Sequence, residues 1–154
     1  MIVVNKIILV FFSLIFVTLS SCDFNSGRTL RMTIDNECIA ESGTRISLSR
    51  EASKSYYACL MSSDEDVVLG WRVNNRDPEK WESERYKAIR FRAKSNKCKL
   101  SFETDDVAII VEVTDVTGKF VSGRFSGRVG IGPGTHRISE GTFRAPVEYW
   151  NREY

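Results

Sequence analysis

The sequence contains very little histidine and proline and has almost no excess of charge. Its 154 residues include one histidine and three prolines, and 22 basic residues face 20 acidic ones. A single histidine does not favour a zinc site of the usual Cys/His type. A small net charge provides no strong field to steer nucleic acid or an anionic surface towards the protein. The length suits one domain with one core.

Sequence motifs for catalysis are also missing. The chain has no G-x-S-x-G nucleophile turn and no C-x-x-C pair. The glycine-rich segment 130–134 is not a phosphate cradle, because no Lys-Ser/Thr follows it and Pro133 removes a backbone donor. The only histidine, His136, follows this segment, and we expect it to be a solvent-exposed turn residue. We therefore expect a protein that is not an enzyme and has neither a cofactor nor a metal.

The first 21 residues carry almost no charge. Lys6 is the only charged side chain before Cys22, and Ile7–Val17 is a nearly unbroken apolar run. A charged start, a short apolar stretch and a small-residue flank are the three parts of a secretory signal. The run is about half the roughly 20 residues that a membrane-spanning helix needs. This favours a cleaved signal helix over 1–21, with an uncleaved anchor beginning at Ile2 as the alternative.

The segment Leu19-Ser20-Ser21-Cys22 resembles the lipobox of bacterial lipoproteins. The resemblance implies cleavage before Cys22 and acylation of its thiol, so that two or three acyl chains hold the protein on a membrane. Residues 22–27 then form a lipidated tether, and residues 28–154 form a single β domain. Asp23 resembles the signal that retains lipoproteins on the inner membrane of enteric-type bacteria. We expect the periplasmic side of that membrane, with the outer membrane as the alternative.

Three cysteines remain once Cys22 carries lipid, namely Cys38, Cys59 and Cys98. The exported compartment is oxidising, so we expect one disulfide among them. All three pairings stay open, and each leaves one thiol over. We expect that thiol to be buried and inert, although an exposed one would be reactive or join two chains.

Apolar and polar residues alternate along most of the remaining chain, which is typical of half-buried strands. The clearest runs are 30–34, 67–73, 107–113, 121–129 and 138–147. Turn signals separate them at the 8–12-residue intervals typical of all-β domains. The charged segment 78–86 is the only candidate for a helix. We predict an all-β fold, an antiparallel barrel or sandwich of about eight to ten strands with one short helix near 79–86.

Glycine and phenylalanine share one face of the last two predicted strands. Gly123, Gly127 and Gly141 alternate with Phe125 and Phe143. Glycines within strands mark bends or close approach of backbones. A strongly coiled sheet or a closing barrel needs such bends.

The segment from Val107 to Val147 resembles the C-terminal part of small calycin-like lipoproteins of bacteria, which are domains of uncharacterised function. The matching residues are Ser122-Gly123-Arg124-Phe125-Ser126-Gly127 and Ile138-Ser139-Glu140-Gly141-Thr142-Phe143-Arg144-Ala145-Pro146. The resemblance covers about a quarter of the chain and implies a lipocalin-like barrel or sandwich. It implies no activity, because a fold does not carry a function. A barrel of this size can hold one small ligand.

A small basic strip is expected on the outward side of the hairpin that these matching residues would form. Arg124 and Arg128 share one face, and a turn near residue 133 would place Thr142 and Arg144 across from Arg124. One interpretation is a contact surface for an acidic partner or anionic headgroups. The other is a solvated face whose charge Glu140 and Glu148 balance.

Trp81 is a further candidate contact residue, because it lies in a charged segment. Exposed tryptophan favours recognition, and the alternative is packing over the end of the barrel. Our leading hypothesis is a non-enzymatic envelope module that binds a small ligand or an envelope partner. The alternatives are an inhibitor or immunity protein that acts on a toxin or hydrolase, and a structural envelope component. An open apolar interior would favour a ligand carrier, and a filled interior an inhibitor.

Overall fold

The computed structural model of the chain describes residues 27–52, 55–96, 99–131 and 134–149. These residues form ten β-strands and one short 3-10 helix, so the predicted all-β fold is confirmed. The predicted signal segment 1–21 and Cys22 lie outside the described residues. The strands are β1 (Thr29–Ile34), β2 (Glu37–Ser42), β3 (Arg45–Ala52), β4 (Ser55–Met61), β5 (Val67–Val73), β6 (Arg85–Ser95), β7 (Leu100–Thr104), β8 (Val107–Thr117), β9 (Phe120–Ile131) and β10 (Gly134–Tyr149), and the helix is η1 (Pro78–Trp81).

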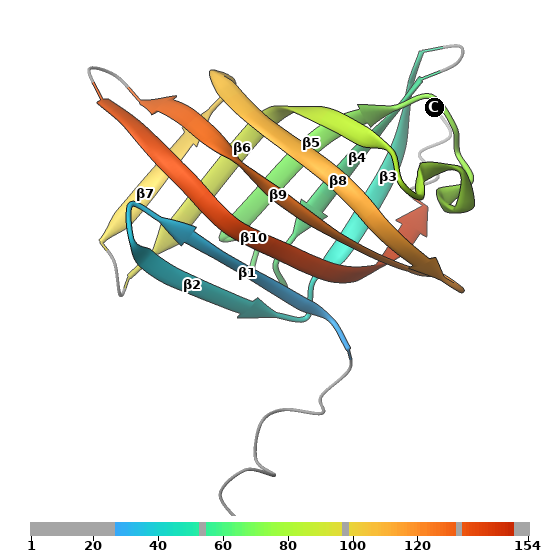
Figure 1. The fold of residues 1–154 in the computed structure, drawn as a ribbon, viewed down its shortest axis with the longest axis horizontal. Coiled ribbons are helices and arrows are strands. Elements are labelled where there is room, and N and C mark those ends of the chain that lie inside the picture. Colours follow the sequence, from blue (N-terminus) through green and yellow to red (C-terminus); the bar gives the residue numbers. More distant parts are fainter. Residues whose placement is uncertain (1–26, 53–54, 97–98, 132–133, 150–154) are drawn as a thin grey trace, which may run out of the picture.

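Seven strands close into a ring through their backbone pairing. The order is β10–β3–β4–β5–β6–β8–β9, and β9 pairs with β10 to complete it. The β1–β2 hairpin adds to β10, and β7 adds to β6. In Figure 1, β1, β2, β8, β9 and β10 form the front layer and β3, β4 and β5 lie behind it. The predicted antiparallel arrangement is confirmed, with one exception: Val147–Tyr149 pairs in parallel with Ile46–Leu48.

Aromatic side chains pack together in the middle of the closed set of seven strands. Trp71 on β5 and Phe143 on β10 come from opposite sides of the ring, and their ring centroids are 6.1 Å apart. Phe125 on β9 lies 6.4 Å from Phe143. Aromatic pairs at 4.5–7 Å are in direct packing contact. The described core runs from Leu30 to Val147.

The glycines on β9 and β10 make room for these rings. Gly123 pairs with Phe143, and Gly141 pairs with Phe125. A Cβ on Gly123 would lie 2.5 Å from Cζ of Phe143, and a Cβ on Gly141 would lie 2.6 Å from Cδ2 of Phe125. Each ring therefore covers the glycine on the neighbouring strand, which is a known way to stabilise glycine within a sheet.

The helical segment is shorter than predicted. Pro78 opens η1, and the Asp77 carboxylate accepts a hydrogen bond from the Glu79 amide at 3.1 Å. The helix ends at Trp81, and Tyr86 already belongs to β6. The predicted helix over 79–86 is thus wrong in its second half, because β6 begins at Arg85 and its inward residues pack against the core.

Candidate functional site

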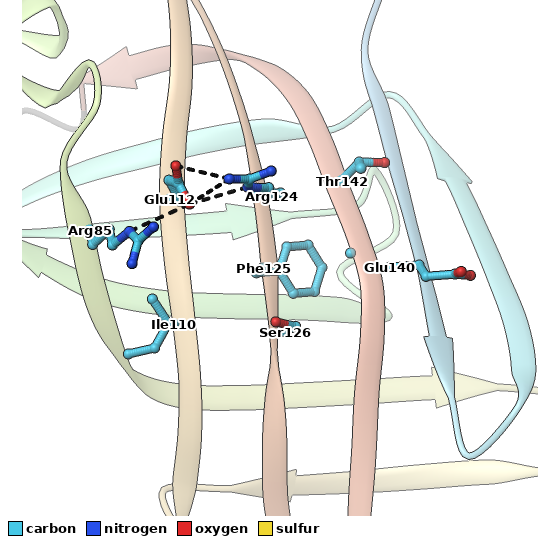
Figure 2. Close-up of a pocket in the computed structure, with 9 residues that line it drawn as sticks. Arg85, Ile110, Glu112, Arg124, Phe125, Ser126, Glu140 and Thr142 are labelled. Atoms are coloured by element: carbon cyan, nitrogen blue, oxygen red, sulfur yellow. Dashed lines mark hydrogen bonds and ion pairs between the residues drawn. The ribbon is translucent and has the colours of Figure 1, made fainter.

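The candidate site is a groove on the outward side of β8, β9 and β10 (Figure 2). It has a volume of about 580 Å³ and is lined by Arg85, Ile110, Glu112, Arg124, Phe125, Ser126, Glu140, Gly141 and Thr142. The small residues Ser126 and Gly141 lie between the larger side chains of Ile110 and Glu140, which leaves the hollow between the walls.

An ion-paired triad closes one end of the groove. Glu112 on β8 lies directly between Arg85 on β6 and Arg124 on β9 in the strand register. Arg124 donates to Glu112 through Nε at 3.1 Å and Nη2 at 3.2 Å, and Nε of Arg85 lies 3.6 Å from the same carboxylate. Two guanidiniums share one carboxylate, so the triad keeps a net positive charge. Both arginines are exposed, and each pair therefore contributes at most about 1 kcal/mol to stability.

Ile110 is the exposed apolar wall of the groove. Its exposed fraction is 49%, and in the strand register it lies between Lys87 on β6 and Ser126 on β9. Figure 2 shows it beside Arg85 and Glu112. An isolated surface isoleucine is ordinary, but this one lies among the cations of the triad and Lys87.

The cations continue beyond the groove. Arg128 on β9 and Arg137 on β10 lie directly opposite each other, and both are exposed. Like charges directly opposite each other destabilise a sheet. Within the described segments, Arg31, Lys87, Arg128 and Arg137 form no ion pair with a carboxylate.

We call the outward side of β8, β9, β10 and β1, together with the first three residues of β6 that pair with β8, the basic face. Its cations are Arg31, Arg85, Lys87, Arg124, Arg128 and Arg137; its carboxylates are Glu112 and Glu140, with Asp106 and Asp115 near the two ends of β8. Four arginines outside the basic face form ion pairs with Glu65, Glu51 and Glu103, and two of them share Glu103. The four arginines are Arg45, Arg72, Arg90 and Arg92. The basic face holds six cations and four carboxylates, and four of its cations have no carboxylate partner in the described segments.

The hairpin residues of the predicted strip lie partly as expected. Thr142 pairs with Arg124, as predicted, whereas Arg144 pairs with Ser122. Arg144 is half-buried, because its guanidinium donates to the Gly27 carbonyl at 2.9 Å and lies 4.3 Å from the centre of the Phe120 ring. It fixes the start of the described chain to β10. The carboxylate that balances Arg124 is Glu112 rather than Glu140 or Glu148.

Trp81 is not part of any contact surface. Its exposed fraction is 0%, and its indole Nε1 donates to the Asn75 carbonyl at 2.8 Å. The apolar ring closes the core beside β8 while its one polar atom is satisfied by the loop. The proposal of an exposed Trp81 is wrong, and the packed alternative is confirmed.

His136 differs from the predicted solvent-exposed turn residue. It lies within β10, its ring stacks on Phe102 of β7 at 5.2 Å, and Nδ1 contacts the Asp35 carboxylate. Asp35 also accepts from the Arg137 amide at 2.9 Å. This backbone hydrogen bond, followed by the contact with His136, holds the pKa of Asp35 below its ordinary value. The pair attaches the β1–β2 turn to β10. Cys38 lies in the same β1–β2 hairpin, and its sulfur contacts the Thr33 hydroxyl.

The predicted disulfide is not formed between the described cysteines. Cys38 and Cys59 are both free thiols, the first exposed on β2 and the second buried on β4. Cys38 lies across from Thr33, and Cys59 lies between Ser47 and Gly70 in the register. Burial raises the pKa of the Cys59 thiol, so it stays protonated and unreactive. Cys98 lies outside the described residues.

Sequence reasoning found Arg124 and Arg128 but missed most of the basic face. Arg85 and Lys87 join it only because β6 pairs with β8 through its first three residues. Arg137 joins it because the register of β10 against β9 shifts between Ile138 and Gly141, which places Arg137 opposite Arg128. The outward position of Ile110 could have been read from the alternation around Ile109 and Val111, but nothing in the sequence indicated its cationic neighbours.

Comparisons with known proteins place no further constraint on this site. The chain matches no family model, no curated protein and no solved structure. Within the described residues, no helix is long and apolar enough to cross a membrane, and no group of three His, Cys, Asp or Glu side chains is arranged to hold a metal ion.

Proposed function

We propose that the protein is a lipid-anchored, non-enzymatic binding module of the bacterial cell envelope, and that it works through its outward surface. Cleavage before Cys22, acylation of its thiol, a periplasm-facing location and the calycin-like assignment are all parts of this proposal. The lipobox residues at 19–22 support the anchor, and the groove on the basic face supplies the binding surface.

The contact between Trp71 and Phe143 carries the choice of the outward surface over the interior. These rings meet at 6.1 Å from opposite sides of the ring of strands. A pocket for a small organic ligand needs roughly 300–1,000 Å³, and rings in contact across the middle leave no such space between them. The filled centre is also what an inhibitor or immunity protein would have, which makes that class the second candidate.

An apolar fluorescent probe tests the choice between interior and surface. The chain from residue 22, with Cys22→Ser, is titrated with N-phenyl-1-naphthylamine. We expect no saturable binding by this protein and a gain of binding by Phe143→Ala, because removing the ring opens a cavity of the kind that takes up small apolar molecules. Saturable binding without that substitution would show an open interior and favour a ligand carrier.

Metabolic labelling tests the anchor separately. Cells expressing the full chain are fed an alkyne analogue of palmitate. We expect label on the wild-type protein and none on the Cys22→Ser variant. Label on neither protein would remove the envelope assignment, whatever the probe experiment shows.

A further inference from the structure

The basic face and the first strand lie on the same side of the molecule. Gly27 leads into β1, and β1 pairs with β10 at the edge of the basic face, contributing Arg31 to it. In Figure 1, β1 runs in the same front layer as β8, β9 and β10. The chain therefore enters the fold next to β10 and close to Arg31 of the basic face.

The proposed lipid would keep this side close to a bilayer. Four residues lie between Cys22 and Gly27, and the five Cα-to-Cα steps of a fully extended chain between them reach at most about 18 Å. Arg144 holds the Gly27 carbonyl and so fixes the origin of this tether on β10. A domain held within such a distance of the headgroups meets them with one of the faces next to its tether.

The composition of the basic face suits anionic headgroups. Four of its cations have no carboxylate partner in the described part of the chain, and two of them, Arg128 and Arg137, lie directly opposite each other. An anionic surface would relieve their repulsion. Ile110 projects from the middle of this face between Lys87 and the arginines of the triad, and an apolar side chain among cations suits the boundary between headgroups and acyl chains.

We infer that the basic face docks on anionic phospholipid headgroups of the membrane that carries the lipid anchor, so that the opposite half of the ring of strands faces away from the bilayer. This inference deepens the proposed function and rests on it for the short tether. The occupant is the lipid surface rather than a protein, because the positive charge is spread over five strands instead of being confined to the groove.

Vesicle co-sedimentation of the chain without its lipid isolates this contact. The chain from residue 22 with Cys22→Ser contains the entire described core and is mixed with vesicles of phosphatidylcholine, alone or with phosphatidylglycerol. We expect binding to the anionic vesicles only, and its loss at high salt, because salt screens exposed charges. Equal binding to neutral and anionic vesicles, or no binding to either, overturns the inference.

Two triple variants with the same net charge distinguish this face from a general effect of charge. The first is Arg124→Glu, Arg128→Glu and Arg137→Glu. The second, on the other half of the ring, combines the exposed residues in Arg50→Glu, Arg72→Glu and Lys94→Glu. Each basic residue near an anionic leaflet strengthens binding roughly fivefold, so the first variant should bind at least tenfold more weakly than the second. Equal losses in the two variants overturn the inference.

Maleimide labelling of Cys38 provides a readout that needs no surface mutation. Cys38 is exposed on β2, and it contacts Thr33 on the outward side of β1. In the lipidated full-length protein, we expect its labelling, followed by peptide mass spectrometry, to slow in anionic relative to neutral vesicles. Equal rates would show that the anchored domain does not lie on this face. The palmitate experiment reports the lipid anchor alone. A negative result there therefore rejects the anchor, whereas equal maleimide rates reject the docking face.

Discussion

The ring of Phe143 on β10 occupies the space that a side chain at Gly123 on β9 would need. A Cβ on Gly123 would lie 2.5 Å from Phe143 Cζ and 2.5 Å from the backbone oxygen of Glu112. The same arrangement recurs between Phe125 and Gly141. Phe143 in turn packs against both Phe125 and Trp71, so the three rings form one aromatic cluster between opposite strands.

Replacing Gly123 by alanine should destabilise the fold. The added methyl group meets a ring and a backbone oxygen, and only the ring can move. Overpacking of this kind costs about 1–3 kcal/mol, measured as the free energy of unfolding in urea. Ser126→Ala, on the outward side of the same strand, is the control and should change stability by less than about 0.5 kcal/mol. Equal stability of the two variants would show that the ring does not cover the glycine.

Trp81 should behave as a core residue rather than a contact residue. Trp81→Ala removes a fully buried ring and should cost about 3–5 kcal/mol. Trp81→Phe keeps a smaller aromatic ring and loses the hydrogen bond to the Asn75 carbonyl, which is worth about 1 kcal/mol, so it should cost less than Trp81→Ala. Urea unfolding measures both changes. If Trp81→Ala leaves the stability unchanged, the packing described for η1 is incorrect.

The contact between Asp35 and Arg137 should make stability depend on pH. The folded-state pKa of Asp35 lies below its ordinary value of 3.8. The stabilisation that ionised Asp35 provides is therefore complete above pH 3.8 and is lost as the pH falls through the folded-state pKa. Because Asp35 is exposed, we expect an effect below about 1 kcal/mol. Asp35→Asn tolerates the same left-handed turn and should lose this dependence. The comparison is the free energy of unfolding of both proteins between neutral and acidic pH; parallel curves would contradict the prediction.

Removing the carboxylate of the triad should strengthen docking on anionic vesicles. Glu112→Gln adds one net positive charge to the basic face, which should raise binding roughly fivefold. The ion pairs that it breaks are exposed, so stability should fall by no more than about 1 kcal/mol. Glu103→Gln removes the same charge from β7 on the other half of the ring and serves as the control. Equal gains in the two variants would argue against a specific face.

The two described thiols should differ strongly in reactivity. Cys38 is exposed, whereas Cys59 is buried and its pKa is raised. Maleimide should therefore modify Cys38 at least tenfold faster than Cys59 in the folded protein. Both should react at similar rates in urea, as followed by peptide mass spectrometry. Rapid modification of Cys59 in the folded state would show that β4 is not covered as described.

The sequence was sufficient to predict the strand content, because a period of two is a local signal. The runs around Trp71 and Val111 were predicted from it, and both are strands in the fold. Strand β2 was missed, since its segment Glu37–Ser42 buries only Ile39 and lacks a clear alternation. Asp35 and Asn36 form the turn before it, and both have positive φ, as a two-residue hairpin turn requires.

The site was harder to predict, because its residues meet through pairings that no local pattern encodes. Two features illustrate this. The net charge of the chain is only +2 and suggested no anionic partner, yet strand pairing brings six cations together on the basic face. Likewise, the charged neighbours of Trp81 suggested exposure, whereas burial depends on where η1 folds back onto the barrel.

The parallel contact between β3 and β10 also sets the order in which the molecule can be assembled. Val147 lies opposite Ile46, so the seam joins segments about a hundred residues apart and uses almost the last described residues. A chain that is still emerging from a ribosome or a translocation channel lacks this seam, and its first strands have no closing partner. The barrel can become a closed object only after its final strand has arrived, and contacts this distant in sequence are slow to form.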